Sequence, residues 1–234
     1  MSSSLYLQLD NPAWSALTGP QRSFAEGNDV VKRFRSNNLP FSAYDYENAD
    51  QVHQLDELLK PGEVFFLIGE LPPLPENWTV LADLRCLQMI NAAPVVPLEN
   101  KVEITLLTET HKQDMIDLVQ RVQPGYFAPD TYQLGNYYGI WDKGTLVAMA
   151  GERMRVTGMT EISAVCTHPD YTGRKYAQQL VTKICNDNHS NGIIPFLHVL
   201  ETNERAVKLY EFMGFATRRV ISFWKLQKRG WVEK

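Results

Sequence analysis

The sequence is short of the residues that build disulfide frameworks and metal centres. Its 234 residues include three cysteines, an odd number, which lie far apart and form no CxxC pair. The five histidines show no HExxH spacing. We therefore expect no disulfide framework, no metal and no metal-dependent hydrolysis. Scattered free cysteines fit a reducing compartment, which predicts a cytoplasmic location.

An excess of one charge and long apolar runs are missing as well. Lys and Arg number 23 and Asp and Glu 27, which leaves a formal net charge of −4. Without a basic excess, neither nucleic acid nor an anionic membrane is an expected partner. The longest apolar runs, such as residues 64–68, fall far short of the roughly 18 residues that a membrane helix needs. The opening residues, MSSSLYLQLD, also predict neither a secretion signal nor a lipid anchor.

What is present is the composition of a folded protein with one internal joint. Hydrophobic residues make up 44% and charged residues 21%, which argues against disorder. The stretch NAAPVVPLENK, residues 91–101, holds two prolines and has no clear period. We therefore divide the chain into residues 1–98 and residues 99–234.

Residues 1–98 resemble a small α/β domain of unknown role. Turn signals rich in Pro, Gly and Asn separate strand-like runs at 63–68 and 79–84, and a helical stretch lies near 49–59. We find no catalytic motif in this half.

Residues 99–234 show a clearer alternation of strands and helices. Strands are expected at 102–107, 136–141, 145–155, 161–167, 195–200 and 215–227. Helices are expected at 109–122, from 176 to a stop between 188 and 192, and at 203–213. Thr108 is the expected N-cap of the first helix, and Gly214 is placed to end the last one.

The densest chemical signal is VCTHPDYTGRKYAQQL, residues 165–180, which predicts a strand, a turn and a helix N-terminus. The free N–H groups and the dipole of such a helix end can hold phosphate. Gly173 would let the backbone approach an anion closely, and Arg174 and Lys175 add positive charge. The alternative is an ordinary turn with a solvated basic pair.

A second signal is LHVLETNERAVKLYEFMGF, residues 197–215. By itself, Asn203 is explained by a helix N-cap and Tyr210 by a core tyrosine.

Together the two stretches resemble the GCN5-related N-acetyltransferase (GNAT) superfamily, particularly its FR47-like branch. The second matches the signature N-x-x-A-x-x-L-Y-x-x-x-G-F without a gap. The first resembles the acyl-CoA pyrophosphate motif Q/R-x-x-G-x-G/A and keeps Ala177, but Thr172 replaces Gln or Arg and Lys175 replaces a glycine. The resemblance covers roughly residues 102–227. Bacterial proteins with a divergent N-terminal half and a GERxR…TEISAVCTHP core are closer still, and here that core spans residues 151–169.

The resemblance implies a fold. The C-terminal half would be a mixed, mostly antiparallel sheet with a V-shaped splay between two parallel strands, at 165–167 and 195–200. The N-terminal half would be a smaller α/β domain, which could be a degenerate copy of the same fold. It could cap the acceptor side of the site or make a homodimer.

The resemblance also implies that acetyl-CoA lies in the V. Strand backbone would bind the pantetheine arm, the turn would bind the pyrophosphate, and Asn203 would hydrogen-bond the arm. The lysine at 175 would either weaken this binding or pair with phosphate. The implied cofactor contacts are Val165, Cys166, Thr167, Thr172, Gly173, Arg174, Lys175, Tyr176, Ala177, Asn203 and Ala206.

The reaction implied is direct transfer of an acetyl group to an amine on a small molecule or a peptide. No covalent enzyme intermediate is needed, so Cys166 need not act as a nucleophile. Tyr210 matches the family's tyrosine acid. Glu161 and His198 both match positions at which branches of the family carry a base, and a water chain is the third alternative. Glu152 is a weaker acidic candidate.

Aromatic residues are expected to form the acceptor pocket or part of the core, at Tyr126, Phe127, Tyr132, Tyr137, Tyr138, Phe223 and Trp224. The sequence therefore predicts an acyl-CoA-dependent N-acetyltransferase. The alternative is a non-catalytic module that binds acyl-CoA or a partner protein, which the departures at Thr172 and Lys175 favour. A site for another phosphate ligand, such as a nucleotide, is disfavoured because neither GxGxxG nor GxxxxGK[ST] is present.

Overall fold

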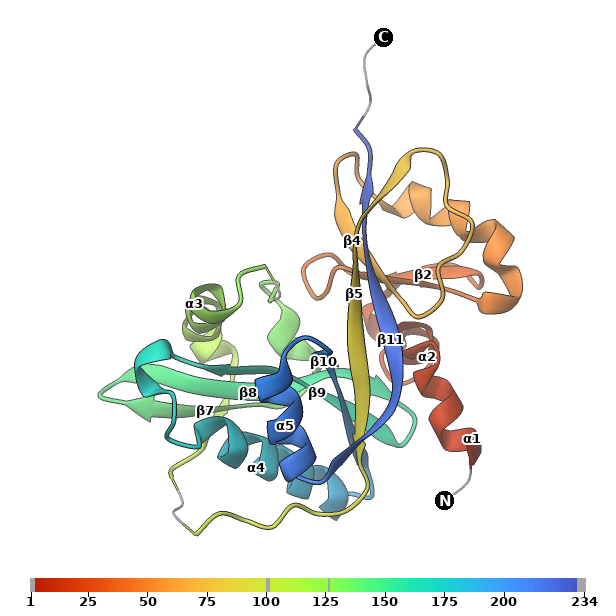
Figure 1. Cartoon of the computed structure of the whole chain (residues 1–234). Helices are drawn as coiled ribbons and strands as arrows, with labels where there is room; N and C mark the ends of the chain where they lie inside the picture. Colours follow the sequence, from red (N-terminus) through yellow and green to blue (C-terminus); the bar gives the residue numbers. More distant parts are fainter. Residues whose placement is uncertain (1–2, 100–101, 126, 231–234) are drawn as a thin grey trace.

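A single sheet runs through both halves of the chain. The computed structural model describes residues 3–99, 102–125 and 127–230, and its 11 strands follow the order β1-β2-β3-β4-β11-β5-β10-β9-β8-β7-β6 (Figure 1). The pairs β3–β4 and β9–β10 are parallel, and the other neighbours are antiparallel. The strands are β1 Ala25–Gly27, β2 Val31–Phe34, β3 Phe41–Tyr44, β4 Val64–Ile68, β5 Trp78–Asn91, β6 Thr105–Leu107, β7 Tyr137–Asp142, β8 Thr145–Val156, β9 Met159–Thr167, β10 Ile194–Leu200 and β11 Phe215–Lys228.

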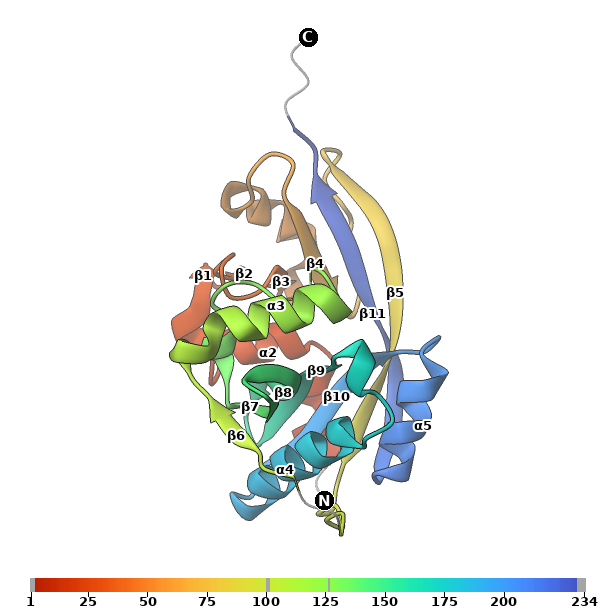
Figure 2. The same cartoon turned by 90° about the vertical axis from the view of Figure 1, so that its left-hand side faces the viewer.

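Helices cover the sheet on both faces. In Figures 1 and 2, α3 and α4 lie on opposite sides of β7, β8 and β9. The α-helices are α1 Ser3–Tyr6, α2 Pro12–Thr18, α3 Lys112–Val122, α4 Tyr176–Ser190 and α5 Glu204–Phe212. The 3₁₀ helices are η1 Leu7–Leu9, η2 Arg22–Phe24, η3 Tyr46–Leu58, η4 Glu109–His111, η5 Thr131–Leu134 and η6 Pro169–Tyr171. Among the described residues, no helix is both long enough and apolar enough to pass through a membrane.

The elements expected after residue 102 are found within a few residues of their predicted ends. The Thr108 side chain and His111 form a capping box at η4, and Gly214 ends α5 with φ +84°. The α4 stripe is buried as its 3.6-residue period predicts, including Leu180 and Ile184. In the first half, the predicted strand at 79–84 is part of the much longer β5, and the predicted helix near 49–59 is the 3₁₀ segment η3.

The expected splay lies between β9 and β10. The two strands pair from Met159 to Ile162 on one side and from Ile194 to Leu197 on the other, and no register pair follows. Beyond that point β9 bulges, because Met149 and Gly151 of β8 face Cys166 and Ser163. A bulge bends a strand away from its neighbour, so β9 and β10 diverge. The mixed sheet and its V confirm the fold that the resemblance implied.

The two halves exchange their last strands. β5 comes from the first half yet lies between β10 and β11, and β11 comes from the second half yet lies between β4 and β5. On either side of this central pair stands a parallel pair, β3–β4 joined by η3 and β9–β10 joined by α4. This arrangement is what a degenerate copy of the same fold would produce. The division at residues 98 and 99 stays a prediction, since the sheet continues across it.

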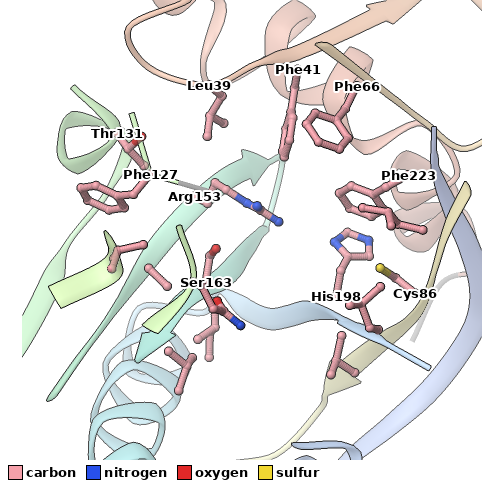
Figure 3. Close-up of a pocket in the computed structure, with 18 of the residues that line it drawn as sticks. Leu39, Phe41, Phe66, Cys86, Phe127, Thr131, Arg153, Ser163, His198 and Phe223 are labelled. Atoms are coloured by element: carbon pink, nitrogen blue, oxygen red, sulfur yellow. The ribbon is translucent and has the colours of Figure 1, made fainter. Parts of the chain in front are cut away.

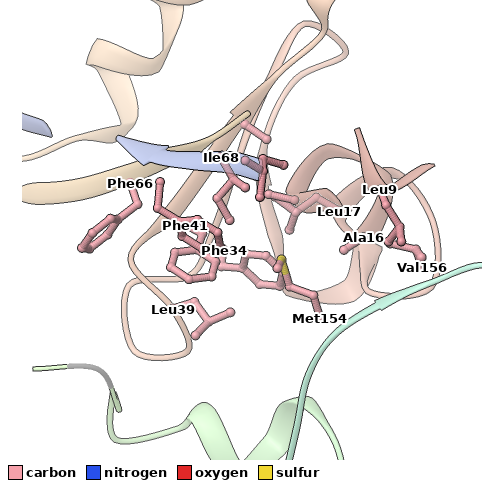
Figure 4. Close-up of a cluster of buried hydrophobic side chains, with 14 of the residues drawn as sticks. Leu9, Ala16, Leu17, Phe34, Leu39, Phe41, Phe66, Ile68, Met154 and Val156 are labelled. Atoms are coloured by element: carbon pink, nitrogen blue, oxygen red, sulfur yellow. The ribbon is translucent and has the colours of Figure 1, made fainter. Parts of the chain in front are cut away.

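One hydrophobic core joins the halves beside β8. Leu17 of α2 and Phe34 of β2 share a buried cluster with Met154 and Val156 of β8 (Figure 4). The same cluster includes Phe41, which is 5% exposed. The first half is therefore fixed against the β8 strand that carries Arg153, and β3 is held at the open side of the V.

Candidate active site

A cavity of about 250 Å³ opens where β9 and β10 diverge. The second half lines it with Val165, Asn203 and Tyr210, and the first half lines it with Phe41 and Phe66. Figure 3 shows side chains from β3, β4, β8 and β10 turned toward this common space. The cavity therefore joins the V to a wall that the N-terminal half supplies.

One end of the cavity offers polar backbone and an amide. Beyond Ile162, the edge of β9 that faces β10 has no register partner, so its N–H and C=O groups can pair with an extended ligand as a strand would. The Asn203 side chain caps α5 by accepting a hydrogen bond from the Ala206 N–H at 3.2 Å. Its Nδ2 makes no hydrogen bond to any residue that the structure describes. This donor and acceptor set fits the amide-rich arm of an acyl-CoA.

The turn before α4 is open to solvent. Thr172, Gly173, Arg174 and Lys175 are all exposed, and Gly173 has φ +79° in open space, since a Cβ added there would meet no atom within 4 Å. Lys175 takes a left-handed conformation, φ +61°, which is the conformation that glycine favours. The Arg174 side chain packs over the Tyr171 ring, with its Cζ 4.6 Å from the ring centre. The N-terminus of α4, from Tyr176, is thus accessible to a diphosphate.

The thiol of Cys166 faces the protein interior. Its side chain packs with Leu107 and Met115 in a buried cluster, and burial raises its pKa to about 12. Cys166 is absent from the cavity lining. A thiol held protonated in the core is unsuited to nucleophilic attack, so only its backbone is available to a ligand.

Tyr210 presents a protonated hydroxyl to the cavity. The residue is 8% exposed and lines the cavity, and its ring edge contacts Phe215 with centroids 5.7 Å apart. Burial raises the pKa of Tyr210 well above its ordinary value, and Cys166 adds to this. The hydroxyl has no hydrogen-bond partner within the described ranges, so it is available as a proton donor.

Glu161 lies behind the cavity wall. Arg153 donates to both of its oxygens, from Nε at 2.8 Å and from Nη2 at 2.6 Å. His198 Nδ1 lies 2.7 Å from Glu161 Oε1. Burial would raise the pKa of Glu161, but Arg153 and then His198 lower it to about 2. The carboxylate is therefore ionised and already occupied by donors.

His198 lines the cavity, but both of its ring nitrogens have partners. Gln88 is its cross-strand neighbour on β5, and the Nε2 atoms of the two residues are 3.0 Å apart. The orientation of the Gln88 amide follows from its other bonds, because Arg218 donates to Oε1 and Nε2 donates to the Leu9 carbonyl. Gln88 thus donates to His198 Nε2, and His198 donates from Nδ1 to Glu161.

The sequence interpretation missed Arg153 as a site residue. Its side chain is 14% exposed, lines the cavity, and places Cζ 4.8 Å from the centre of the Phe41 ring. The register of β8 and β9 shifts between Glu152 and Arg155, and this bulge directs Arg153 toward the cavity. The GERMR run that contains it was the available signal, but a bulge cannot be located from alternation.

The expected aromatic pocket is formed only in part. Phe127, Tyr137 and Phe223 line the cavity, whereas Tyr138 donates to Asp187 and Trp224 to the Gly69 carbonyl. Tyr132 does not line it either, since its ring stacks with Lys112. Tyr126 lies outside the described residues. The walls that complete the pocket, Leu39, Phe41 and Phe66, come from the first half, in which no site was predicted.

Glu152, the weaker acidic candidate, also lies away from the cavity. Arg155 donates to its Oε2 at 2.6 Å and Asn188 to its Oε1 at 2.9 Å. Its carboxylate therefore ties β8 to α4.

Known proteins are similar to this chain in sequence and in fold. The family model of FR47-like proteins matches residues 137–224. A protein from Novosphingobium aromaticivorans that is assigned to the GNAT family of acetyltransferases has a crystal structure with a TM-score of 0.86. It is 33% identical, and the alignment covers 94% of this chain and 98% of that one. No curated protein matches the chain.

More distant structures share the fold alone. A GCN5-related N-acetyltransferase from Kribbella flavida has a TM-score of 0.63 at 14% identity, covering 95% of this chain and 96% of that one. A GCN5-related N-acetyltransferase-like protein from Streptococcus suis has a TM-score of 0.55 at 13% identity, covering 95% and 97%. Both alignments span the two halves.

Proposed function

Since this chain belongs to the GCN5-related N-acetyltransferase (GNAT) family, we propose that it transfers an acetyl group directly from acetyl-CoA to the nitrogen of an amine. The observation that carries the proposal is the end of β9–β10 pairing at Ile162 and Leu197, with a cavity at that point and Tyr210 on its wall. When bound in the V, acetyl-CoA supplies an acyl group activated as a thioester. A cytoplasmic location and a homodimer remain predictions.

The residues of the V and of the following turn would hold the acyl-CoA. The free edge of β9 from Val165 to Thr167 would pair with the pantetheine arm, and Asn203 Nδ2 would donate to the same arm. The N–H groups between Thr172 and Ala177 would receive the pyrophosphate, and the exposed ammonium of Lys175 would balance its charge.

Tyr210 is the proposed acid of the reaction. The amine nitrogen forms a bond to the acyl carbon, the carbon–sulfur bond breaks, and the electron pair leaves on sulfur. Tyr210 donates its proton to that sulfur as it leaves, because a tyrosine with a raised pKa is protonated at neutral pH. The proton that the amine loses restores the tyrosine through solvent, so the exchange balances.

Glu161 and His198 are proposed as positioning residues, with a water chain taking the proton from the amine. A base needs a free lone pair and a pKa near the working pH. The lone pairs that could take up a proton already accept hydrogen bonds. Glu161 accepts one from Arg153 at 2.8 Å, and His198 accepts one from Gln88 at 3.0 Å. The pKa of Glu161, about 2, also makes it a weak base. Both side chains instead hold Arg153 in one orientation.

Calorimetry and steady-state kinetics test the proposal together. The protein is expected to bind acetyl-CoA and to release CoA when amines are added. Tyr210→Phe should lower kcat by about 10²-fold or more, the usual contribution of a proton donor, and leave the affinity for acetyl-CoA unchanged. Tyr138→Phe is the matched control, because the Tyr138 hydroxyl donates to Asp187 away from the cavity, and it should retain full turnover.

A non-catalytic acyl-CoA-binding module is the second candidate. It is favoured by the occupied lone pairs of Glu161 and His198 and by the lysine at the first glycine position of the phosphate motif. It predicts heat with acetyl-CoA but no product from a broad amine panel. Absence of heat with acetyl-CoA and with longer acyl-CoAs would refute both candidates.

A further inference from the structure

We infer that the acceptor is an amino acid with an apolar side chain, whose carboxylate binds Arg153 and Tyr137. The inference rests on the proposed function, because it names the amine that enters the same cavity. Three features of the cavity carry it: a guanidinium with donors to spare, a buried hydroxyl that has no partner in the described part of the chain, and aromatic walls from the first half of the chain.

The guanidinium of Arg153 is held firmly but has donors to spare. Nε and Nη2 donate to Glu161, while Nη1 donates to no residue within the described part of the chain. Figure 3 shows the side chain extending into the cavity in the region of Phe41 and His198. The planar donor edge of an arginine matches a carboxylate in two parallel hydrogen bonds. A side chain already fixed by Glu161 loses little freedom when it binds one.

The chain of polar contacts behind Arg153 explains this rigidity. Glu161 is fixed by His198, which is fixed by Gln88, whose amide is fixed by Arg218. Arg218 in turn donates to Asp10 at 2.7 Å. Glu161, His198, Gln88 and Arg218 lie on four different strands, so the guanidinium is oriented by a network that crosses the sheet.

Tyr137 adds an unused hydroxyl to the same cavity. Its Oη is buried and has no hydrogen-bond partner among the residues that the structure describes, and the residue lines the cavity. Its ring lies against Gly151, its partner on β8, where any Cβ would overlap the ring. Burial raises the pKa of Tyr137 and the charge of Arg153 opposes that rise, which places the hydroxyl within the field of the guanidinium. Because buried polar groups are normally hydrogen-bonded, we expect this hydroxyl to donate to an acceptor on a bound ligand.

The remaining walls are apolar. Phe41 contacts Phe66 and Phe223 edge-on, with ring centroids 6.0 Å and 5.9 Å apart. A site of about 250 Å³ with aromatic walls and a few converging polar groups suits a small ligand with one apolar side chain. Because Glu161 already neutralises Arg153, an amino acid that enters as a zwitterion brings no net charge into the buried site.

Matched acceptors test the carboxylate. We expect phenylalanine to be acetylated with a kcat/KM at least tenfold above that of phenylalaninamide and phenethylamine, which keep the amine and the ring but lack the carboxylate. Leucine should also exceed its amide, and glycine, which lacks the apolar side chain, should be poorer than phenylalanine. Equal rates for acids and amides would overturn the inference while leaving the N-acetyltransferase intact.

Tyr137→Phe separates binding from structure. If the hydroxyl binds the carboxylate, KM for phenylalanine rises about tenfold, as expected for loss of one hydrogen bond to a charged group, and KM for phenylalaninamide and kcat stay unchanged. If the hydroxyl is merely structural, neither KM moves, because within the described ranges it has no protein partner to lose. The first outcome supports the inference and the second contradicts the role of Tyr137.

Arg153→Lys keeps a cation for Glu161 and removes the planar edge. It should reduce the acid-to-amide preference at least tenfold, and circular dichroism with acetyl-CoA calorimetry shows whether the variant is folded. An equal loss for acids and amides would mean that Arg153 serves the acyl-CoA side and would overturn the assignment. Failure to bind acetyl-CoA or to acetylate any amine would instead be the failure of the proposed function.

Discussion

Lys175 adopts a backbone conformation that suits glycine better than lysine. Its φ of +61° is left-handed, and a side chain there costs about 1–2 kcal/mol relative to an ordinary conformation. Glycine adopts the same conformation freely but loses more chain entropy on folding, by roughly 0.5–1 kcal/mol. The family motif has glycine here, so this protein accepts strain in exchange for an ammonium beside the expected phosphates.

Lys175→Gly should raise the free energy of unfolding by about 0.5–1 kcal/mol, the difference between the two effects, and should weaken acetyl-CoA binding. Urea titration and calorimetry measure the two changes. Arg174→Gly is the control, since Arg174 has no positive φ to relieve, and should lower stability. A loss of stability in Lys175→Gly as well would contradict the strain.

Glu161 is expected to dominate one part of the acid-unfolding curve. Its pKa is lowered from 4.5 to about 2 by Arg153 and His198 despite burial. A depressed pKa means that its stabilising contribution is complete above about pH 4.5 and is lost as pH falls toward 2. The shift corresponds to something on the order of 3 kcal/mol.

Glu161→Gln should therefore be less stable than the wild-type protein at pH 7, with a flatter dependence of stability on pH between about 4.5 and 2. Unfolding in urea at several pH values measures this slope. Glu204→Gln is the control, since the Glu204 side chain is 81% exposed, and it should keep the wild-type slope. An unchanged slope in Glu161→Gln would show that the ion pair does not depress this pKa.

At the scale of the element, the N-cap residue of α5 is expected to contribute both to stability and to the proposed ligand binding. Asn203 accepts a hydrogen bond from the Ala206 N–H with Oδ1, and the residue lines the cavity. A side-chain N-cap contributes roughly 1 kcal/mol to a helix. The same residue is therefore expected to have two separable roles.

Asn203→Ala should lower the free energy of unfolding by about 1 kcal/mol and also weaken acetyl-CoA binding. Asn203→Asp keeps the cap but replaces the donor with an anion, so stability should be retained while affinity falls. Chemical unfolding and calorimetry on both variants give the two readings. Full affinity in Asn203→Asp would rule out the amide as a ligand donor.

Local patterns predicted most elements but not the length of β5. The apolar period correctly predicted α4, and the run before His168 correctly predicted β9, because one face of each element meets a core. β5 is predicted as 79–84 but continues to Asn91, since β10 and β11 pair with it on its two edges. Pairing of this kind depends on strands over a hundred residues away, which leave no periodic signal in residues 85–91.

At the scale of the whole molecule, neither half has a complete sheet of its own. β5 separates β10 from β11, and β11 separates β4 from β5. Removing the first half would leave β10 and β11 without the strand that pairs with both of them. It would also remove Phe41 and Phe66 from the wall of the cavity.

A fragment of residues 99–234 expressed by itself should therefore be insoluble or unfolded, because exposed strand edges and a broken core favour aggregation. Co-expression with residues 1–98 should restore a soluble complex that binds acetyl-CoA. Gel filtration and circular dichroism distinguish the outcomes. A folded, monomeric 99–234 fragment would show that the division near residue 98 separates independent domains.

The sequence by itself predicted the family and the residues proposed to act in the V, because the motif residues lie in two short, continuous segments around Gly173 and Tyr210. A strand, a turn and a helix end are local structures, so their spacing along the chain is also their spacing in space. The acceptor end is different in kind. Arg153, Tyr137 and Phe41 meet only because β8 bulges, Gly151 leaves room for a ring and the two halves exchange strands. Contacts between distant segments arise from folding as a whole, and so the proposed acceptor could be inferred only from the three-dimensional arrangement.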